Sequence, residues 1–202
     1  MLNNLFSPEI FLIIPAIIIA MSIHEAAHAY SAYYYGDDTA KAHGRLTLNP
    51  LAHIDPIGFL LLIVAGFGWA KPVPVNPRNF RGNKRLADFV VSVAGIATNL
   101  TAAALTLSIM KHVNITSQGL FNFLQTFVRF NIILAVFNIL PIPPLDGSKM
   151  LAALLPSSMA RVIWFLDQYG MFILMLLVFT NVIGMVLSPM VNFVAVMLML
   201  LP

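Results

Sequence analysis

The sequence predicts an all-α membrane protein with about four to six transmembrane helices. Of its 202 residues, 59% are hydrophobic and only 9% are charged, whereas soluble domains carry about 25% charged residues. A water-soluble fold of this size cannot hide so much apolar surface, so the surrounding solvent must be lipid. Several apolar stretches also approach about 20 residues, the length at which a helix spans a bilayer.

Four stretches are long enough to cross a membrane, and a fifth apolar piece is shorter. The N-terminus lacks the basic start and the small-residue cleavage site of a secretory signal, so the first stretch should remain as a membrane helix. The last piece, residues 190–201, predicts only a short or partial helix. We expect the four full spans over residues 8–35, 86–110, 120–140 and 159–187.

Residues 57–76 do not fit a simple span. Their apolar part, 57–70, is short and contains three glycines, and Pro72, Pro74 and Pro77 follow it. Because proline ends a helix, the chain beyond residue 70 should be extended. We interpret residues 57–76 as a re-entrant, β-hairpin-like segment, which membranes tolerate only where protein or a cavity covers the backbone.

Basic residues orient the predicted helices. Five Lys and Arg lie between residues 71 and 85, and cytoplasmic loops carry an excess of these residue types. If residues 57–76 are re-entrant, this loop shares the cytoplasmic side with Lys41, Arg45, Lys149 and Arg161. The chain would then be a multi-pass protein of the cell membrane with four main spans and an outside N-terminus.

Composition also limits the function classes. The chain has no cysteine, which excludes disulfides and thiolate metal sites, so any metal must be held by His, Asp or Glu. No stretch interleaves basic and aromatic residues, so we expect no nucleic-acid partner. There is no internal repeat or appended soluble domain, and residues 1–202 are expected to form a single domain.

The second half of the first span carries the pattern H-E-x-x-H, formed by His24, Glu25 and His28. Two histidines four residues apart lie on one face of a helix and can bind one metal ion. The glutamate between them can reach a metal-bound water as general base. Because ionisable groups are costly inside a membrane, such a group is a functional hypothesis by default. The alternative is a buried polar cluster that joins helices.

A catalytic zinc site takes three protein ligands and leaves one position for water, so a third ligand must come from elsewhere. The candidate is Asp146, which follows Pro141, Pro143 and Pro144 at the end of the third span. The predicted topology places this turn on the same side of the membrane as the second half of the first helix. Asp before Gly is also an ordinary turn dipeptide, which is the alternative for Asp146.

Two motifs, H-E-x-x-H and N-x-x-P-x-P-P-L-D-G over residues 138–147, resemble the site-2 protease family of intramembrane zinc metalloproteases. Residues 44–58 resemble a compact branch of that family without extra soluble domains, and residues 95–99 resemble its G-x-x-x-N core helix. The resemblance covers roughly residues 10–155. It implies a single integral membrane metalloprotease domain that binds one catalytic Zn²⁺ through His24, His28 and Asp146, with Glu25 as base.

The resemblance also implies that the substrates are transmembrane proteins, and the predicted topology places the active site towards the cytoplasmic side. Asn138 matches the family's asparagine and could hold the scissile peptide or the oxyanion, or instead bond between helices. His53 lies in a polar loop that could fold over the metal or only cap the loop. Asn99 is expected to pack helices. Residues 72–77 could pair with an unwound substrate peptide as an added strand.

The competing function is a membrane zinc carrier or a non-catalytic scaffold with a structural metal. A carrier would need ligands on several helices along a path, and neither alternative requires a glutamate beside His24. Replacing Glu25 therefore separates these functions from proteolysis. The residues indicate membrane lipid as the surroundings.

Overall fold

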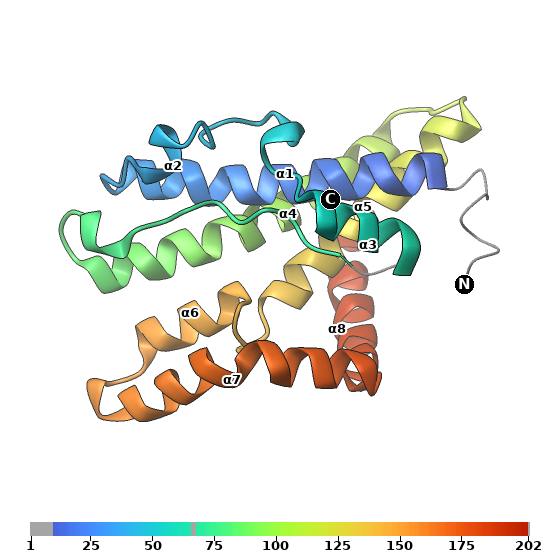
Figure 1. Ribbon diagram of the computed structural model, residues 1–202. Helices are drawn as coiled ribbons and strands as arrows, with labels where there is room; N and C mark the ends of the chain where they lie inside the picture. The colour runs from blue at the N-terminus through green and yellow to red at the C-terminus, as the bar shows by residue number, and fades with distance from the viewer. Residues whose placement is uncertain (1–9, 66–67, 202) are drawn as a thin grey trace.

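The computed structural model describes residues 10–65 and 68–201, and every regular element among them is a helix (Figure 1). Five of these helices are long and apolar enough to cross a membrane. The expectation of an all-α, multi-pass membrane protein is therefore confirmed. The five are α1 (Ile10–Tyr34), α4 (Lys84–His112), α5 (Gln118–Asn138), α7 (Ala160–Phe179) and α8 (Val182–Met199).

Helices α1, α4 and α5 form the centre of the molecule. Small side chains, including Ala20, Ala103 and Ala135, are fully or almost fully buried where these helices meet. In lipid, where no hydrophobic force drives helices together, small residues let backbones approach closely enough for strong van der Waals contact. The close approach brings the polar groups of α1 against α4.

Side-chain caps set where the central helices begin. The Asn83 side chain accepts a hydrogen bond from the Leu86 N–H at the start of α4. The Ser117 hydroxyl accepts one from the Leu120 N–H at the start of α5. Such caps satisfy backbone donors that have no partner within the helix.

The short helix α6 (Asp146–Leu154) follows α5 and packs against the first part of α4. Helix α7 returns beside the proline turn, where a Cβ on Gly170 would lie 2.7 Å from the Pro143 side chain. Helix α8 then packs on α5 and α4, and its backbone end accepts hydrogen bonds from Lys111. Figure 1 shows α7 and α8 meeting at a sharp angle at the lower right.

The prediction of one span over residues 159–187 and a short piece after it is wrong. Helix α7 ends at Phe179, and Asn181 takes a left-handed conformation with φ 59° before α8 begins. Asparagine tolerates this conformation better than most residues. Pro189 lies inside α8 without ending it, so residues 190–199 are the second half of an 18-residue helix. Thr180 and Asn181 alone interrupt the apolar sequence here, and so short a polar stretch does not end a span predicted from hydropathy.

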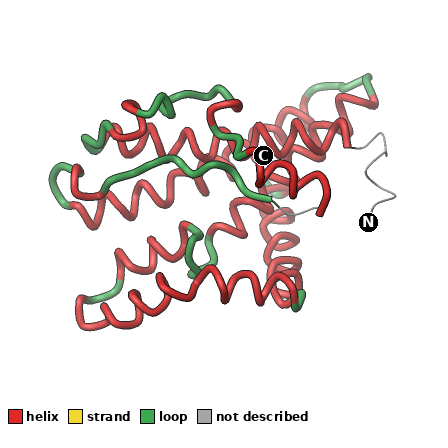
Figure 2. The backbone as a smooth tube through the Cα atoms, in the orientation of Figure 1, coloured by secondary structure: helices red, strands yellow, loops and turns green. Residues whose placement is uncertain are grey.

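The β-hairpin expected within residues 57–76 is not confirmed. Helix α3 (Pro56–Ala65) occupies the first part, and the bridge between Ile54 and Ala70 is isolated. The following residues run extended beside the helices without a strand partner among the described residues (Figure 2). Pro72 and Pro74 lack the N–H groups that a ladder needs. Residues 66–67, and residues 8–9 of the first predicted span, lie outside the described residues.

Polar contacts attach this extended segment, residues 71–76, to α1 and its C-terminal turn. The Val73 N–H donates to Glu25 and the Asn76 N–H donates to Asp37. Asp37 is fully buried and also accepts from Thr39 and Asn79. The segment is thus held along the face of α1 that carries the H-E-x-x-H residues.

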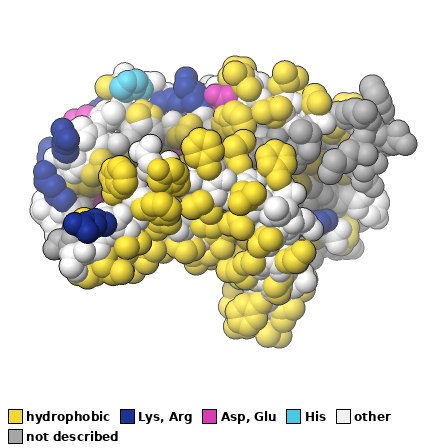
Figure 3. Space-filling model, turned by 60° about the horizontal axis from the view of Figure 1, so that its bottom comes forward, with side chains coloured by type: hydrophobic (Ala, Val, Ile, Leu, Met, Phe, Trp, Pro, Cys, Tyr) yellow, Lys and Arg dark blue, Asp and Glu magenta, His cyan; other side chains and the backbone are white. Residues whose placement is uncertain are grey.

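The surface is that of a protein in lipid. Figure 3 shows hydrophobic side chains over most of one face, with Lys and Arg concentrated at the end where α4 and α7 begin. Large apolar side chains on α7 and α8, such as Phe172, Phe179 and Phe193, are more than half exposed. Contiguous apolar surface of this kind is rare on soluble monomers.

Candidate metal centre

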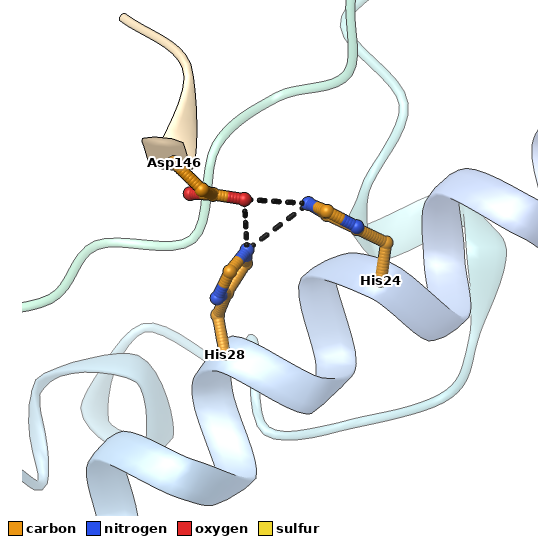
Figure 4. Close-up of side chains that lie close together, drawn as sticks. All are labelled: His24, His28 and Asp146. Atoms are coloured by element: carbon orange, nitrogen blue, oxygen red, sulfur yellow. Dashed lines mark hydrogen bonds and ion pairs between the residues drawn. The ribbon is translucent and has the colours of Figure 1, made fainter. Parts of the chain in front are cut away.

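The structure brings His24, His28 and Asp146 together, although Asp146 lies more than a hundred residues further along the chain. The histidines project from adjacent turns of α1, and Asp146 is the first residue of α6 (Figure 4). Each pair among His24 Nε2, His28 Nε2 and Asp146 Oδ2 is 3.0 Å apart. All three side chains are buried.

Hydrogen bonds at the far side of each ring determine which nitrogen faces the cluster. His28 Nδ1 lies 2.7 Å from the Val91 carbonyl oxygen, so it must donate. His24 Nδ1 lies 2.7 Å from Asn99 Oδ1. That oxygen is an acceptor because the Asn99 amide nitrogen donates to the Ala20 carbonyl and to Asn131. Both rings therefore present an Nε2 lone pair to the cluster.

Three buried acceptors that face one another at 3.0 Å require positive charge between them. A metal ion can serve all three at once. His24 Nε2, His28 Nε2 and Asp146 Oδ2 would hold such an ion, and two histidines with one carboxylate are a ligand set of catalytic zinc sites. The donor set and its spacing thus fit one zinc ion.

Helix α4 forms one wall of this centre through Val91, Gly95 and Asn99, which are spaced four residues apart on one face. An added Cβ at Gly95 would lie 2.5 Å from His24 Cε1 and 2.6 Å from His28 Nε2. Only glycine leaves room for both imidazole rings. The expectation that Asn99 packs helices is incomplete, since it also orients the His24 ring.

The proline turn positions Asp146. Gly147 follows it, and a Cβ there would lie 2.2 Å from the Ile139 carbonyl oxygen, so the turn closes only with glycine. The Ser148 hydroxyl donates to the Leu145 carbonyl at the start of α6. Lys149 Nζ lies 3.8 Å from Asp146 Oδ1, the carboxylate oxygen that faces away from the histidines.

Glu25 is half-buried and lines the same cavity as the three candidate ligands, a space of about 410 Å³. Its Oε2 accepts a hydrogen bond from the Val73 N–H at 2.8 Å. The extended segment thereby holds the carboxylate beside the cavity. Helices α1, α4, α5 and α6 supply the other walls.

The other two predicted site residues lie in different surroundings. Asn138 lines the cavity, and its amide nitrogen donates to the Leu134 carbonyl of its own helix. His53 is 2% exposed and its Nε2 lies 2.9 Å from the Thr47 carbonyl, outside the residues that line the metal cavity. The His53 carbonyl accepts from the Lys71 N–H, at the start of the extended segment.

Sequence reasoning missed two contacts of this site. The Val91 carbonyl carries no side-chain signal, and nothing in the sequence indicated its role. Asn99 is an amide four residues after a glycine on a membrane helix, and this spacing was the available signal. Such partners fix the tautomer and orientation of ligand histidines and raise their basicity.

Comparisons with known proteins agree with this chemistry. The profile of peptidase family M50 matches residues 104–178, which include Asp146. The chain is 42% identical over 184 residues to "Putative zinc metalloprotease YwhC" of Bacillus subtilis, covering 87% of this chain and 84% of that protein. It is 31% identical over 175 residues to "Putative zinc metalloprotease Rip2" of Mycolicibacterium smegmatis, covering 84% of this chain and 67% of the relative. No solved structure gives a significant match.

Proposed function

The chain belongs to peptidase family M50, the site-2 protease family, and is a multi-pass zinc metalloprotease. From this premise we propose that it hydrolyses transmembrane proteins at a zinc site formed by His24, His28 and Asp146. The observation that carries the proposal is the convergence of the three ligand atoms at 3.0 Å, with both Nδ1 positions already engaged. Zinc bound there activates a water molecule and polarises the substrate carbonyl.

Glu25 is the proposed general base. It takes a proton from the attacking water and passes it to the leaving amine. Its position beside the candidate ligands, and the hydrogen bond from the Val73 N–H, support this role. Because that bond occupies one carboxylate oxygen, the other remains available for the proton. Asn138, which lines the same cavity, is proposed to hold the substrate peptide.

Residues 71–76 are proposed to bind the substrate backbone. A helical peptide bond is shielded by its own hydrogen bond, so the substrate must unwind before cleavage. An unwound peptide can add as a strand to an unpaired edge. The extended segment lies beside Glu25, and its Val75 N–H and the carbonyls of residues 72–75 form no hydrogen bond among the described residues, which supports this role.

Replacing Glu25 with glutamine tests the catalytic assignment. The variant should retain zinc, because Glu25 is not among the three converging groups, and should lose cleavage of a transmembrane peptide in detergent. Retained cleavage would refute the role of Glu25 as base. A carrier or scaffold predicts instead that neither zinc binding nor function depends on this carboxylate.

We further propose that the protein lies in the cell membrane with the metal cavity towards the cytoplasm. The cluster of Lys and Arg in residues 71–85 lies at the cavity end of α4, and such loops are cytoplasmic. Because the chain has no cysteine, single substitutions can be labelled without background. On intact cells, an impermeant thiol reagent should label Thr116→Cys and spare Lys84→Cys. The reverse pattern would invert the proposed topology.

A further inference from the structure

The metal cavity contains one carboxylate that the proposed mechanism does not use. Asp88 lies on α4, is half-buried, and lines the cavity together with Glu25 and Asp146. Among the described residues, its carboxylate accepts no hydrogen bond and forms no ion pair. Partial burial of a charged carboxylate costs free energy unless a hydrogen-bond donor or a cation pairs with it.

Lys149 lines the same cavity but forms no ion pair with Asp88 among the described residues. Lys149 is itself within 3.8 Å of Asp146 Oδ1, and its side chain is more than half exposed. Asp146 Oδ2 faces the two histidines and would ligate a metal ion held by them. Asp146 thus has partners on both oxygens, whereas Asp88 forms no ion pair among the described residues.

Asp88 lies between the metal centre and the start of α4. Gly95, which contacts both histidine rings, follows it by seven residues, or about 10 Å along a helix axis. An extended peptide covers that distance in about three residues. The extended segment spans the same interval, because Val73 bonds to Glu25 and Pro77 also lines the cavity.

We propose that Asp88 is a subsite for a Lys or Arg side chain of the substrate, about three residues from the scissile bond on the side that faces the start of α4. The proposal rests on the proteolytic function above. Membrane proteins carry Lys and Arg at the cytoplasmic ends of their spans, so a cation at this position is common among transmembrane substrates. The subsite would select spans whose basic flank begins close to the cleaved bond.

A library of synthetic transmembrane peptides tests this subsite without a known substrate. The peptides share one apolar span and are randomised at the flanking positions on both sides. They are incubated in detergent with purified wild type, Asp88→Asn, Asp88→Lys and Glu25→Gln, and the products are sequenced by mass spectrometry. Asp167→Asn is the matched control, because it removes the same charge from an exposed position on α7 outside the cavity.

Wild type and Asp167→Asn should cleave peptides with a basic residue two to four positions from the cut about 2–5-fold faster than neutral ones, the range of a modest ion pair. Asp88→Asn should lose this preference, and Asp88→Lys should favour acidic residues there. Equal zinc content in all variants will show that the metal site is intact.

Two failures are distinguishable. If neither wild type nor Glu25→Gln cleaves any peptide, the proteolytic function itself is refuted, and the subsite with it. If wild type cleaves without a basic preference, or if Asp88→Asn and Asp88→Lys keep the wild-type preference, the function stands and the subsite is refuted. A preference that follows Asp88 through neutralisation and reversal has no purely structural explanation.

Discussion

Replacing Gly95 with alanine sets two effects of opposite sign against each other. In a helix interior alanine is favoured over glycine by about 0.5–1 kcal/mol, so a substitution without new contacts would stabilise α4. At Gly95, however, the added Cβ would lie 2.5 Å from His24 Cε1 and 2.6 Å from His28 Nε2. Ordinary Cβ contacts begin at 3.4 Å, so each ring is closer by almost 1 Å than contact allows.

Neither ring can move aside without losing a hydrogen bond. His24 is held by Asn99 and His28 by the Val91 carbonyl, and both bonds are 2.7 Å long. Overpacking of this kind costs about 1–3 kcal/mol, which exceeds the gain in helix propensity. Displacement of two ligands together should lower zinc affinity by at least the 10–100-fold typical of disturbed ligand support.

Zinc affinity is measured on purified protein in detergent by competition with a chromophoric chelator. Gly119→Ala is the matched control, since its Cβ would meet only the Ser117 hydroxyl, at 4.0 Å. That variant should bind zinc as wild type does and unfold at an equal or higher temperature. If Gly95→Ala binds zinc as tightly as Gly119→Ala, the inference that α4 packs closely against the two rings is refuted.

Two further predictions concern the groups around the centre. Asn99→Ala should weaken zinc binding about 10–100-fold in the same chelator assay, because His24 Nδ1 loses its acceptor; unchanged affinity would remove Asn99 from the site. Burial raises the pKa of Asp37, but hydrogen bonds from Asn76, Thr39 and Asn79 outweigh it and hold the pKa below its ordinary value of 3.8. The folded state therefore gains stability above pH 3.8 and loses it as the pH falls through the lower folded value. The rate of backbone hydrogen exchange in residues 71–80, corrected for intrinsic rates, should therefore rise in that acidic range. In Asp37→Asn the exchange should be fast already at pH 7. Protection that does not change with pH would contradict this prediction.

Hydropathy predicts part of the helix arrangement. Spans over α1, α4 and α5 follow from length and apolar content, because lipid demands about 20 apolar residues. The break at Asn181 cannot be predicted from hydropathy, because it depends on one left-handed residue within an otherwise apolar stretch. The extended course of residues 71–76 follows from the prolines, but its contact with Glu25 required the position of α1.

The H-E-x-x-H pattern by itself determined two neighbouring candidate ligands and a glutamate, because residues four apart must share a helix face. The prolines before Asp146 indicated a third candidate ligand, because they force a turn at the end of α5. Only the tertiary structure decided that these groups converge at 3.0 Å, that Asn99 and the Val91 carbonyl fix both rings, and that His53 lies elsewhere. Local pattern specifies which groups a segment carries, whereas packing between distant segments decides which groups meet.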